Sequence, residues 1–164
     1  MTGTAKAGNG TRPVIVQKYG GSSLANTEMI HNAATRICAR KDDGTNVIVV
    51  VSAMGDSTDG LIALSQAVTG EVTADAREMD NLLSTGEMVS ATLMAMALNT
   101  RGYGAISLSG GQAGIKTDAV HGPARIADVN TARLRRALDH GRIVIGAGFQ
   151  GLSDSVHRPT PGRG

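Results

Sequence analysis

The feature that most constrains the fold is an unbroken run of β-branched residues at positions 47–51, with the sequence VIVVV. A strand with one face in water alternates apolar and polar residues, whereas an unbroken apolar run is typical of a strand covered on both faces. Such strands belong to parallel sheets that carry helices on each side. The run therefore predicts an α/β fold with a mainly parallel sheet.

Strand and helix patterns alternate along the rest of the chain, as they do in βαβ units. Short apolar runs predict further strands at residues 14–16, 105–108 and 142–146, the first of them buried. Apolar residues at helical spacing predict helices that begin near residues 27, 61, 76 and 131. Residues 115–129 are expected to be irregular or to form paired strands. This order predicts a three-layer αβα architecture.

The helix expected over residues 76–99 carries an apolar stripe, which is typically the face that a helix buries. Gly86 lies in its middle and costs about 1 kcal/mol relative to Ala, so a close backbone approach is expected there. Glu87 follows, and its carboxylate is either a solvated helix-face group or the partner of a substrate ammonium group. The stripe consists of Met79, Leu82, Leu83, Gly86, Val89, Leu93 and Met96.

Composition is that of one globular domain with few aromatic side chains. The 164 residues are 41% hydrophobic and 18% charged, which is enough apolar surface for a core. Aromatic residues make up only 2%, which argues against a nucleic-acid surface that works by base stacking. Arg133, Arg135 and Arg136 form a short basic cluster on one predicted helix, where a solvated face is favoured over a nucleic-acid patch. We therefore expect no nucleic-acid partner.

Cysteine usage and the absence of long apolar stretches bear on location. The single cysteine, Cys38, excludes a disulfide within the chain and fits a reducing compartment. Its neighbours Ile37 and Ala39 favour a buried thiol rather than a nucleophile. No apolar stretch approaches the roughly 20 residues that span a bilayer. Residues 1–12 lack the apolar region of a signal peptide. We expect a cytoplasmic protein without a membrane partner.

The chain divides into three segments by composition. Residues 1–12 are small and polar and are expected to form a flexible tail. Residues 13–151 carry all the strand and helix patterns and form the expected domain. Residues 152–164 contain Pro159 and Pro161, show no periodicity and are expected to be an irregular loop.

Four polar loops that contain glycine follow the predicted strands, at residues 20–23, 52–58, 109–114 and 146–151. Strands of a parallel sheet end at one edge, and ligands of such sheets bind there. Glycine lets backbone N–H groups turn toward an anion, and Lys18, with a helix expected to start just beyond, adds positive charge. Tight turns also use glycine, but four such loops together with Lys18 favour a phosphate site.

Two glycine motifs resemble nucleotide-binding signatures and fail in their context. Residues 146–151 match G-x-G-x-x-G after a strand, but the helix and the acidic residue of a dinucleotide fold do not follow. Residues 110–117 approach a P-loop, but Ile115 separates Gly114 from Lys116. Neither a Rossmann site nor a Walker site is predicted.

An ordered set of motifs resembles the aspartate kinases, within the amino-acid kinase superfamily. Each motif alone is modestly specific, whereas the ordered set is highly specific and covers about residues 14–151. The motifs are QKYGGSS at 17–23, VSAMGDSTD at 51–59, DNLLSTGE at 80–87, SGGQAG at 109–114, HGPARI at 121–126 and AGFQG at 147–151.

The resemblance implies transfer of the ATP γ-phosphoryl group to the side-chain carboxylate of L-aspartate, which gives 4-phospho-L-aspartate for lysine, threonine and methionine biosynthesis. It implies that Mg²⁺ neutralises phosphate oxygens and that catalysis is mostly positioning and electrostatic stabilisation. By this resemblance Lys18 neutralises charge on the transferring group. The implied phosphate cradle is Gly20, Gly21 and Ser22, and the implied aspartate contacts are Ser52, Thr58, Glu87, which pairs the amino group, and Arg163, which holds a carboxylate.

The sequence also departs from the family pattern at its end. Arg163 matches the family arginine, but the Ser-Asp pair that follows it in the family is missing after Gly164. The nucleotide-binding half and the regulatory ACT domains are missing as well, so the resemblance covers the amino-terminal lobe. We expect an incomplete kinase that forms homo- or hetero-oligomers in its complete form. The alternatives are a non-catalytic module that binds full-length subunits, and a glutamate or carbamate kinase, which the Gly86-Glu87 motif disfavours.

Overall fold

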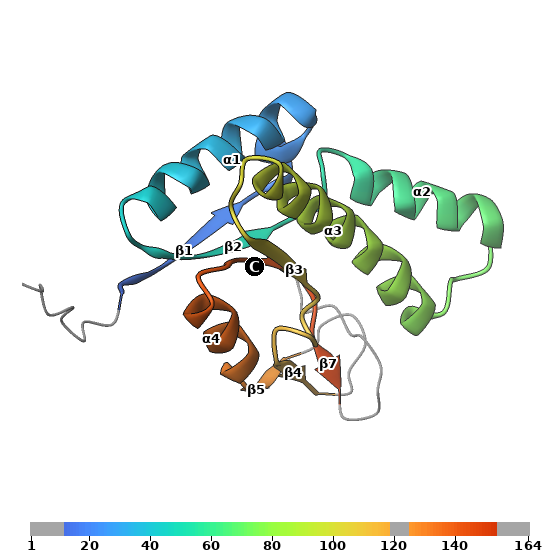
Figure 1. The fold of residues 1–164 in the computed structure, drawn as a ribbon. Coiled ribbons are helices and arrows are strands. Elements are labelled where there is room, and N and C mark those ends of the chain that lie inside the picture. Colours follow the sequence, from blue (N-terminus) through green and yellow to red (C-terminus); the bar gives the residue numbers. More distant parts are fainter. Residues whose placement is uncertain (1–11, 119–124, 154–164) are drawn as a thin grey trace, which may run out of the picture.

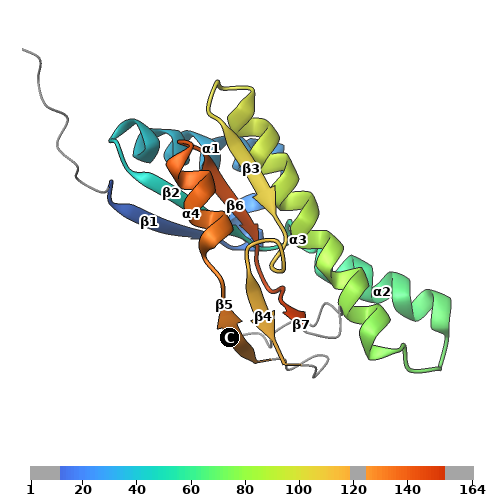
Figure 2. The same ribbon diagram turned by 60° about the horizontal axis from the view of Figure 1, so that its bottom comes forward.

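A four-stranded parallel sheet forms the centre of the molecule, which the computed structural model describes at residues 12–118 and 125–153. Its strands follow the order β1 (Val14–Tyr19), β2 (Asn46–Val51), β6 (Ile143–Ala147) and β3 (Ala105–Leu108). Two helices, α1 (Thr27–Asp42) and α3 (Ala76–Asn99), cover one face, and α4 (Ala132–Asp139) lies on the other (Figure 1 and Figure 2). The predicted α/β class with a parallel sheet is confirmed.

Smaller elements surround this sheet. A short 3-10 turn, η1 (Gly21–Leu24), follows β1, and α2 (Ser57–Thr69) follows β2 and packs against α3. A second sheet has the order β5 (Ile126–Val129), β4 (Ile115–Thr117) and β7 (Leu152–Ser153). The antiparallel β4–β5 pair confirms the paired-strand form expected for residues 115–129.

The second sheet corrects one sequence expectation. Residues 152–164 were expected to be irregular, but Leu152–Ser153 form β7, which pairs in parallel with β4. A two-residue strand is stabilised by its backbone partner rather than by its own apolar pattern, so periodicity cannot reveal it. Residues 154–164 and the expected tail at 1–11 lie outside the described residues.

The α1 helix illustrates how the sequence sets both the start of a helix and its buried face. The side chain of Asn26 accepts a hydrogen bond of 2.9 Å from the backbone N–H of Met29, which satisfies one of the first-turn donors. The residues at helical spacing, Ile30, Ala33, Ala34 and Ile37, are buried as predicted. They face the sheet and α3 in the larger core, with Val47, Val49, Val51, Met94, Leu98, Ile143 and Ile145.

The first strand is less buried than its apolar sequence predicts. Val14 and Val16 are 55% and 61% exposed, whereas Ile15 and Tyr19 on the other side of the strand pack against the larger core. β1 is one of the two edge strands of the sheet, and α4 packs over β6 instead. The prediction of a buried strand is therefore wrong for Val14 and Val16.

The apolar stripe predicted on α3 is also mostly outside the core. Val89, Leu93 and Met96 are exposed, and the helix instead buries small and polar residues together with Met94 and Leu98. Small side chains let α3 lie close to the sheet and to α1, while the larger ones remain on the outer side. The buried residues of α3 are Asp80, Ser84, Gly86, Glu87, Ser90, Ala91, Met94, Ala95, Ala97 and Leu98.

Two further expectations concern the thiol and the membrane. Cys38 is buried, as predicted, and burial raises the pKa of its thiol, which keeps it protonated and unreactive at neutral pH. In the part of the chain that the structure describes, no helix combines the length and apolarity needed to cross a bilayer.

The exposed valines of β1 predict that the chain self-associates. An apolar edge strand offers unpaired backbone groups and apolar side chains to other molecules. We expect Val16→Lys to reduce the associated fraction, measured by light scattering, because a lysine on an edge strand opposes strand pairing.

A matched control is Val68→Lys on α2, where the valine is 80% exposed but lies on a helix. It should leave association unchanged. A monodisperse monomer for the unaltered chain would contradict the prediction.

Candidate functional site

The parallel register brings the four polar loops to one edge of the central sheet. Tyr19 pairs with Val51, and Val51 pairs with Ala147, so β1, β2 and β6 end side by side. Leu108, the last residue of β3, pairs with Gly146 of β6. The loops that begin at Gly20, Ser52, Ser109 and Gly148 therefore leave the same edge, as the sequence predicted (Figure 2).

The first two loops are in direct backbone contact. The N–H of Ser52 donates to the carbonyl oxygen of Tyr19 and that of Gly55 donates to Gly21, both at 3.0 Å. A Cβ on Gly21 would lie 2.8 Å from the carbonyl oxygen of Ala53, closer than real Cβ atoms approach an oxygen. Only glycine fits at position 21, so the cradle predicted there is a packed junction of two loops rather than an isolated turn.

The helix expected just beyond the glycine loop begins where the sequence predicted. Residues 21–24 form η1, and α1 begins at Thr27 with its cap at Asn26. The positive end of α1 therefore lies beyond the loop that carries Gly20, Gly21 and Ser22. Any anion bound by this loop depends on loop amides, hydroxyls and Lys18 more than on the helix dipole.

Lys18 lies one residue before the end of β1, on the face of the sheet opposite α1. It is exposed, and no carboxylate in the described ranges lies within ion-pair distance of its ammonium group. Ser22 is also exposed, while Ser52 and Thr58 are half-buried in the second loop and the first turn of α2. A cation without an anionic partner beside two loops of hydroxyls and glycines is suited to a phosphate group.

A small cavity of about 300 Å³ opens between η1 and α1. Its walls include the hydroxyls of Ser22 and Ser23, the phenol of Tyr19 and the guanidinium of Arg36. Burial raises the pKa of Tyr19, and nearby Arg36 opposes this in part, so the phenol stays a neutral donor at pH 7. Arg36 was not predicted from the sequence, because nothing in its spacing relates it to the glycine loop.

The middle of α3 crosses directly over the second loop. A Cβ on Gly86 would lie 2.9 Å from the Cβ of Ala53, which is the close approach that a glycine in mid-helix predicted. Glu87, the next residue, is only 9% exposed. The interpretation of Glu87 as a solvated helix-face residue is therefore wrong: the residue is buried, one position after the close contact of α3 with the second loop.

Gln150 is a further residue of this edge that sequence reasoning missed. It is 3% exposed, and its Nε2 donates a hydrogen bond of 2.6 Å to the carbonyl oxygen of Ser84 on α3. Gly110 packs directly on its backbone, while its Oε1 has no partner among the described residues. Phe149 before it has a φ of +58°, which is uncommon for a side chain of its size and which only the structure reveals.

Some predicted features lie outside the described residues. These are Arg163 and residues 121–124 of the HGPARI motif. Over residues 12–118 and 125–153, no group of three or more His, Cys, Asp or Glu side chains could hold a metal ion. Magnesium commonly reaches such sites on phosphate oxygens of the nucleotide, and this donor set fits that mode rather than a protein cage.

Comparison with protein-family models matches residues 13–164 to the amino acid kinase family. The chain belongs to this family. It is 51% identical over 151 residues to aspartokinase 2 of Bacillus subtilis and 51% identical over 152 residues to the aspartokinase of Corynebacterium glutamicum. Each alignment covers 92% of this chain and 36% of the relative, so the chain spans about a third of the length of the curated relatives it matches.

Solved structures of aspartate kinases share this fold. The aspartate kinase from Synechocystis is 38% identical, with a TM-score of 0.72 over 93% of this chain and 24% of that one. Aspartokinase III of E. coli, in complex with aspartate and ADP, superimposes with a TM-score of 0.79 at 22% identity, over 93% of this chain and 44% of that one. The second likeness concerns the fold alone.

Replacement of a helical glycine by alanine should have opposite effects on stability at Gly86, which contacts Ala53, and at Gly60, which has open space around it. We expect Gly86→Ala to lower the free energy of unfolding by about 1–3 kcal/mol, because the new methyl group overpacks the junction. Gly60→Ala on α2 is the matched control, because nothing lies within 4 Å of its added Cβ. It should raise stability by about 0.5–1 kcal/mol through helix propensity.

A second change separates crowding from other causes. Ala53→Gly in the Gly86→Ala background removes the opposing methyl group and should recover most of the lost stability, measured by urea denaturation as a double-mutant cycle. An equal loss of unfolding free energy in Gly86→Ala alone and in the double variant would contradict the packing explanation.

Proposed function

We propose that these residues form the phosphate- and aspartate-binding lobe of an aspartate kinase. The observation that carries the proposal is the junction of the loops at Gly21 and Ala53 with α3 at Gly86, which brings the hydroxyl loops and buried Glu87 to the edge where β1 ends just after Lys18. Identity of about 50% to aspartokinases over 92% of the chain supports the same reaction. Aspartate and ADP bound together in aspartokinase III of E. coli support the two ligands.

At the phosphate end, Lys18 supplies the positive charge. The γ-phosphoryl group of ATP carries negative charge that its transfer spreads over the equatorial oxygens, and a fixed cation and backbone donors lower the barrier. Gly20 and Gly21 allow close approach of the backbone to these oxygens, and the hydroxyl of Ser22 can donate a hydrogen bond. Mg²⁺ bound to the phosphates neutralises further charge. Positioning and charge are sufficient, and no protein nucleophile is needed.

At the aspartate end, Glu87 pairs with the substrate ammonium group. A largely buried carboxylate binds a cation more strongly than a solvated one, since less water competes for either charge. Ser52 and Thr58 contribute hydroxyls from the adjoining loop, and Arg163 is proposed to hold a substrate carboxylate. These contacts leave the β-carboxylate of L-aspartate as the acceptor of the phosphoryl group.

A non-catalytic module that associates with full-length subunits is the second candidate. The observation in its favour is the exposed apolar surface of α3, which a partner subunit could cover. We propose in either case a homo- or hetero-oligomer, which the exposed apolar residues Val89, Leu93 and Met96 of α3 support. We further propose a cytoplasmic role in amino-acid biosynthesis, where ATP and L-aspartate are available.

Acyl phosphate formation tests the proposal. The chain, alone and extended to the full length of the aspartokinases, is incubated with ATP, Mg²⁺, L-aspartate and hydroxylamine, and the hydroxamate is measured. Turnover by the extended form, lost in the 164-residue chain, supports an aspartate kinase lobe. Turnover by neither form supports the non-catalytic module.

Substitutions in the extended form separate the two ends of the site. We expect Lys18→Ala to lower kcat by roughly 100- to 1,000-fold, because it removes charge stabilisation of the transferring group. Glu87→Gln should raise KM for aspartate by roughly 10- to 100-fold, because it removes a charged hydrogen bond to the ammonium group.

Two exposed charges serve as controls for these variants. Arg40→Ala on α1 and Glu78→Gln near the start of α3 should leave both constants unchanged. A kcat that survives Lys18→Ala would overturn the phosphate role of this lysine.

A further inference from the structure

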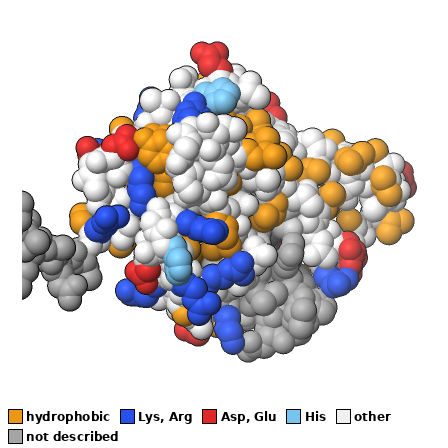
Figure 3. All heavy atoms as spheres, in the orientation of Figure 1, with side chains coloured by type: hydrophobic (Ala, Val, Ile, Leu, Met, Phe, Trp, Pro, Cys, Tyr) orange, Lys and Arg blue, Asp and Glu red, His pale blue; other side chains and the backbone are white. Residues whose placement is uncertain are grey.

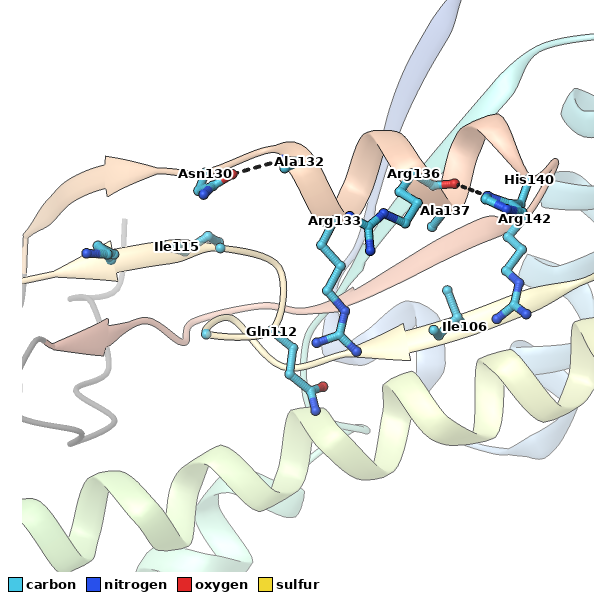
Figure 4. A pocket seen from close by; sticks show the side chains of 13 residues that line it. Ile106, Gln112, Ile115, Asn130, Ala132, Arg133, Arg136, Ala137, His140 and Arg142 are labelled. Carbon is cyan, nitrogen blue, oxygen red and sulfur yellow. Dashed lines mark hydrogen bonds between the residues drawn. The ribbon is translucent and has the colours of Figure 1, made fainter.

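A second cavity, of about 860 Å³, shares with the edge described above only the loop that begins at Ser109. It opens on the α4 face of the sheet, between α4, strand β3 and the loop that joins β3 to β4 (Figure 4). β3 stands three strands from β1 in the sheet, which at the usual spacing of about 4.8 Å is about 14 Å. Neither Lys18 nor residues 20–23 line the cavity.

The described lining of this cavity is cationic. Arg133 and Arg136 come from α4, and His140 and Arg142 come from the turn between α4 and β6. None of the lining residues that the structure describes is acidic, and within its ranges none of these three arginines has a carboxylate at ion-pair distance. Figure 3 shows this gathering of Lys, Arg and His side chains on the face below the sheet. Lys116 also lines the cavity, and it stands opposite Asp128 in the β4–β5 pair.

The structure divides the arginine cluster that the sequence analysis assigned to a solvated helix face. Arg135 donates from its Nε to the hydroxyl of Thr131 and does not line the cavity. Arg133 extends from α4 toward the loop that carries Gln112, and Arg142 extends along β3 near Ile106 (Figure 4). Two segments thus direct guanidinium groups into one cavity, an arrangement that like-charge repulsion opposes unless an anion joins them.

The remaining lining indicates the kind of anion. Ile106, Ile115 and Ala137 give the cavity apolar walls, and its volume is that of a small-molecule site. Guanidinium groups bind carboxylates and phosphates through paired hydrogen bonds. No Phe, Tyr or Trp is among the lining residues described, which disfavours stacked nucleic-acid bases. We propose that this cleft binds a small organic anion with at least two acidic groups, of the phosphate or carboxylate class.

Titration calorimetry with two simple probes tests the proposal. Pyrophosphate and citrate are each titrated into the chain at low salt, and we expect saturable binding with a Kd below about 1 mM for at least one of them. Preference for pyrophosphate assigns the site to phosphorylated ligands, and preference for citrate assigns it to polycarboxylates. No saturation by either probe up to about 10 mM would overturn the proposal.

Matched variants locate the binding. Arg133→Gln and Arg142→Gln should each weaken binding by about tenfold or more, because each removes a charged hydrogen-bonding partner. Arg135→Gln, which removes the same charge from the same helix outside the cavity, should change Kd by less than about threefold. An equal loss in Arg135→Gln would show diffuse attraction and overturn the site.

Two further measurements complete the test. The three arginines are exposed, and thermal melts by circular dichroism should show that their variants keep the fold. The same titration of the Lys18→Ala variant tests whether the probe binds instead at the loop that follows Lys18. Loss of binding there, without loss in Arg133→Gln, would assign the probe to the proposed phosphoryl-transfer loop and overturn the cleft.

Discussion

In-register parallel pairing of β1, β2, β6 and β3 is the constraint on which the rest of this molecule depends. Because parallel strands share a direction, everything that follows them in the chain emerges at a common edge. Glycine, serine and lysine far apart in the sequence become neighbours through this one property. The two loops at Gly21 and Ala53, and α3 above them, then pack so closely that glycine is required at positions 21 and 86.

The two faces of the sheet differ in how completely they are covered. The α1 and α3 face is closed by a core of Val, Ile, Ala, Met and Leu side chains. The other face is covered by the eight-residue α4, which packs over β6 and leaves Val14 and Val16 of β1 exposed. This asymmetry accounts both for the apolar surface at β1 and for the cationic cleft beside α4.

The sequence predicted the main elements of the fold because their signals are local. The run at residues 47–51 identified a buried strand, Asn26 identified the start of α1, and alternation of strands with helices identified the α/β class. The predictions of burial were wrong where burial depends on how other elements of the fold pack. Val14 and Val16 look like core residues until β1 is known to be an edge strand, and Val89 looks like core until α3 is seen to bury its small residues instead.

The candidate site was predictable to the same extent. The close contact at Gly86 was predictable, because a glycine in mid-helix is destabilising unless the backbone is closely approached there. The burial of Glu87 was not, because it depends on how α3 lies over the second loop. Gln150 could not be found from spacing, because its partner Ser84 lies 66 residues away in the chain.

The hydrogen bond from Gln150 to Ser84 has a mechanical consequence. Gln150 joins α3 on one side and, through the backbone that Gly110 contacts, the loop after β3 on the other. A shift of α3 at Ser84 that preserved this bond would carry Gln150 with it, and Gly110 packs so closely on the backbone of Gln150 that no Cβ fits between them. A movement of the helix that carries Glu87 is thereby transmitted through Gln150 to the loop that carries Gln112.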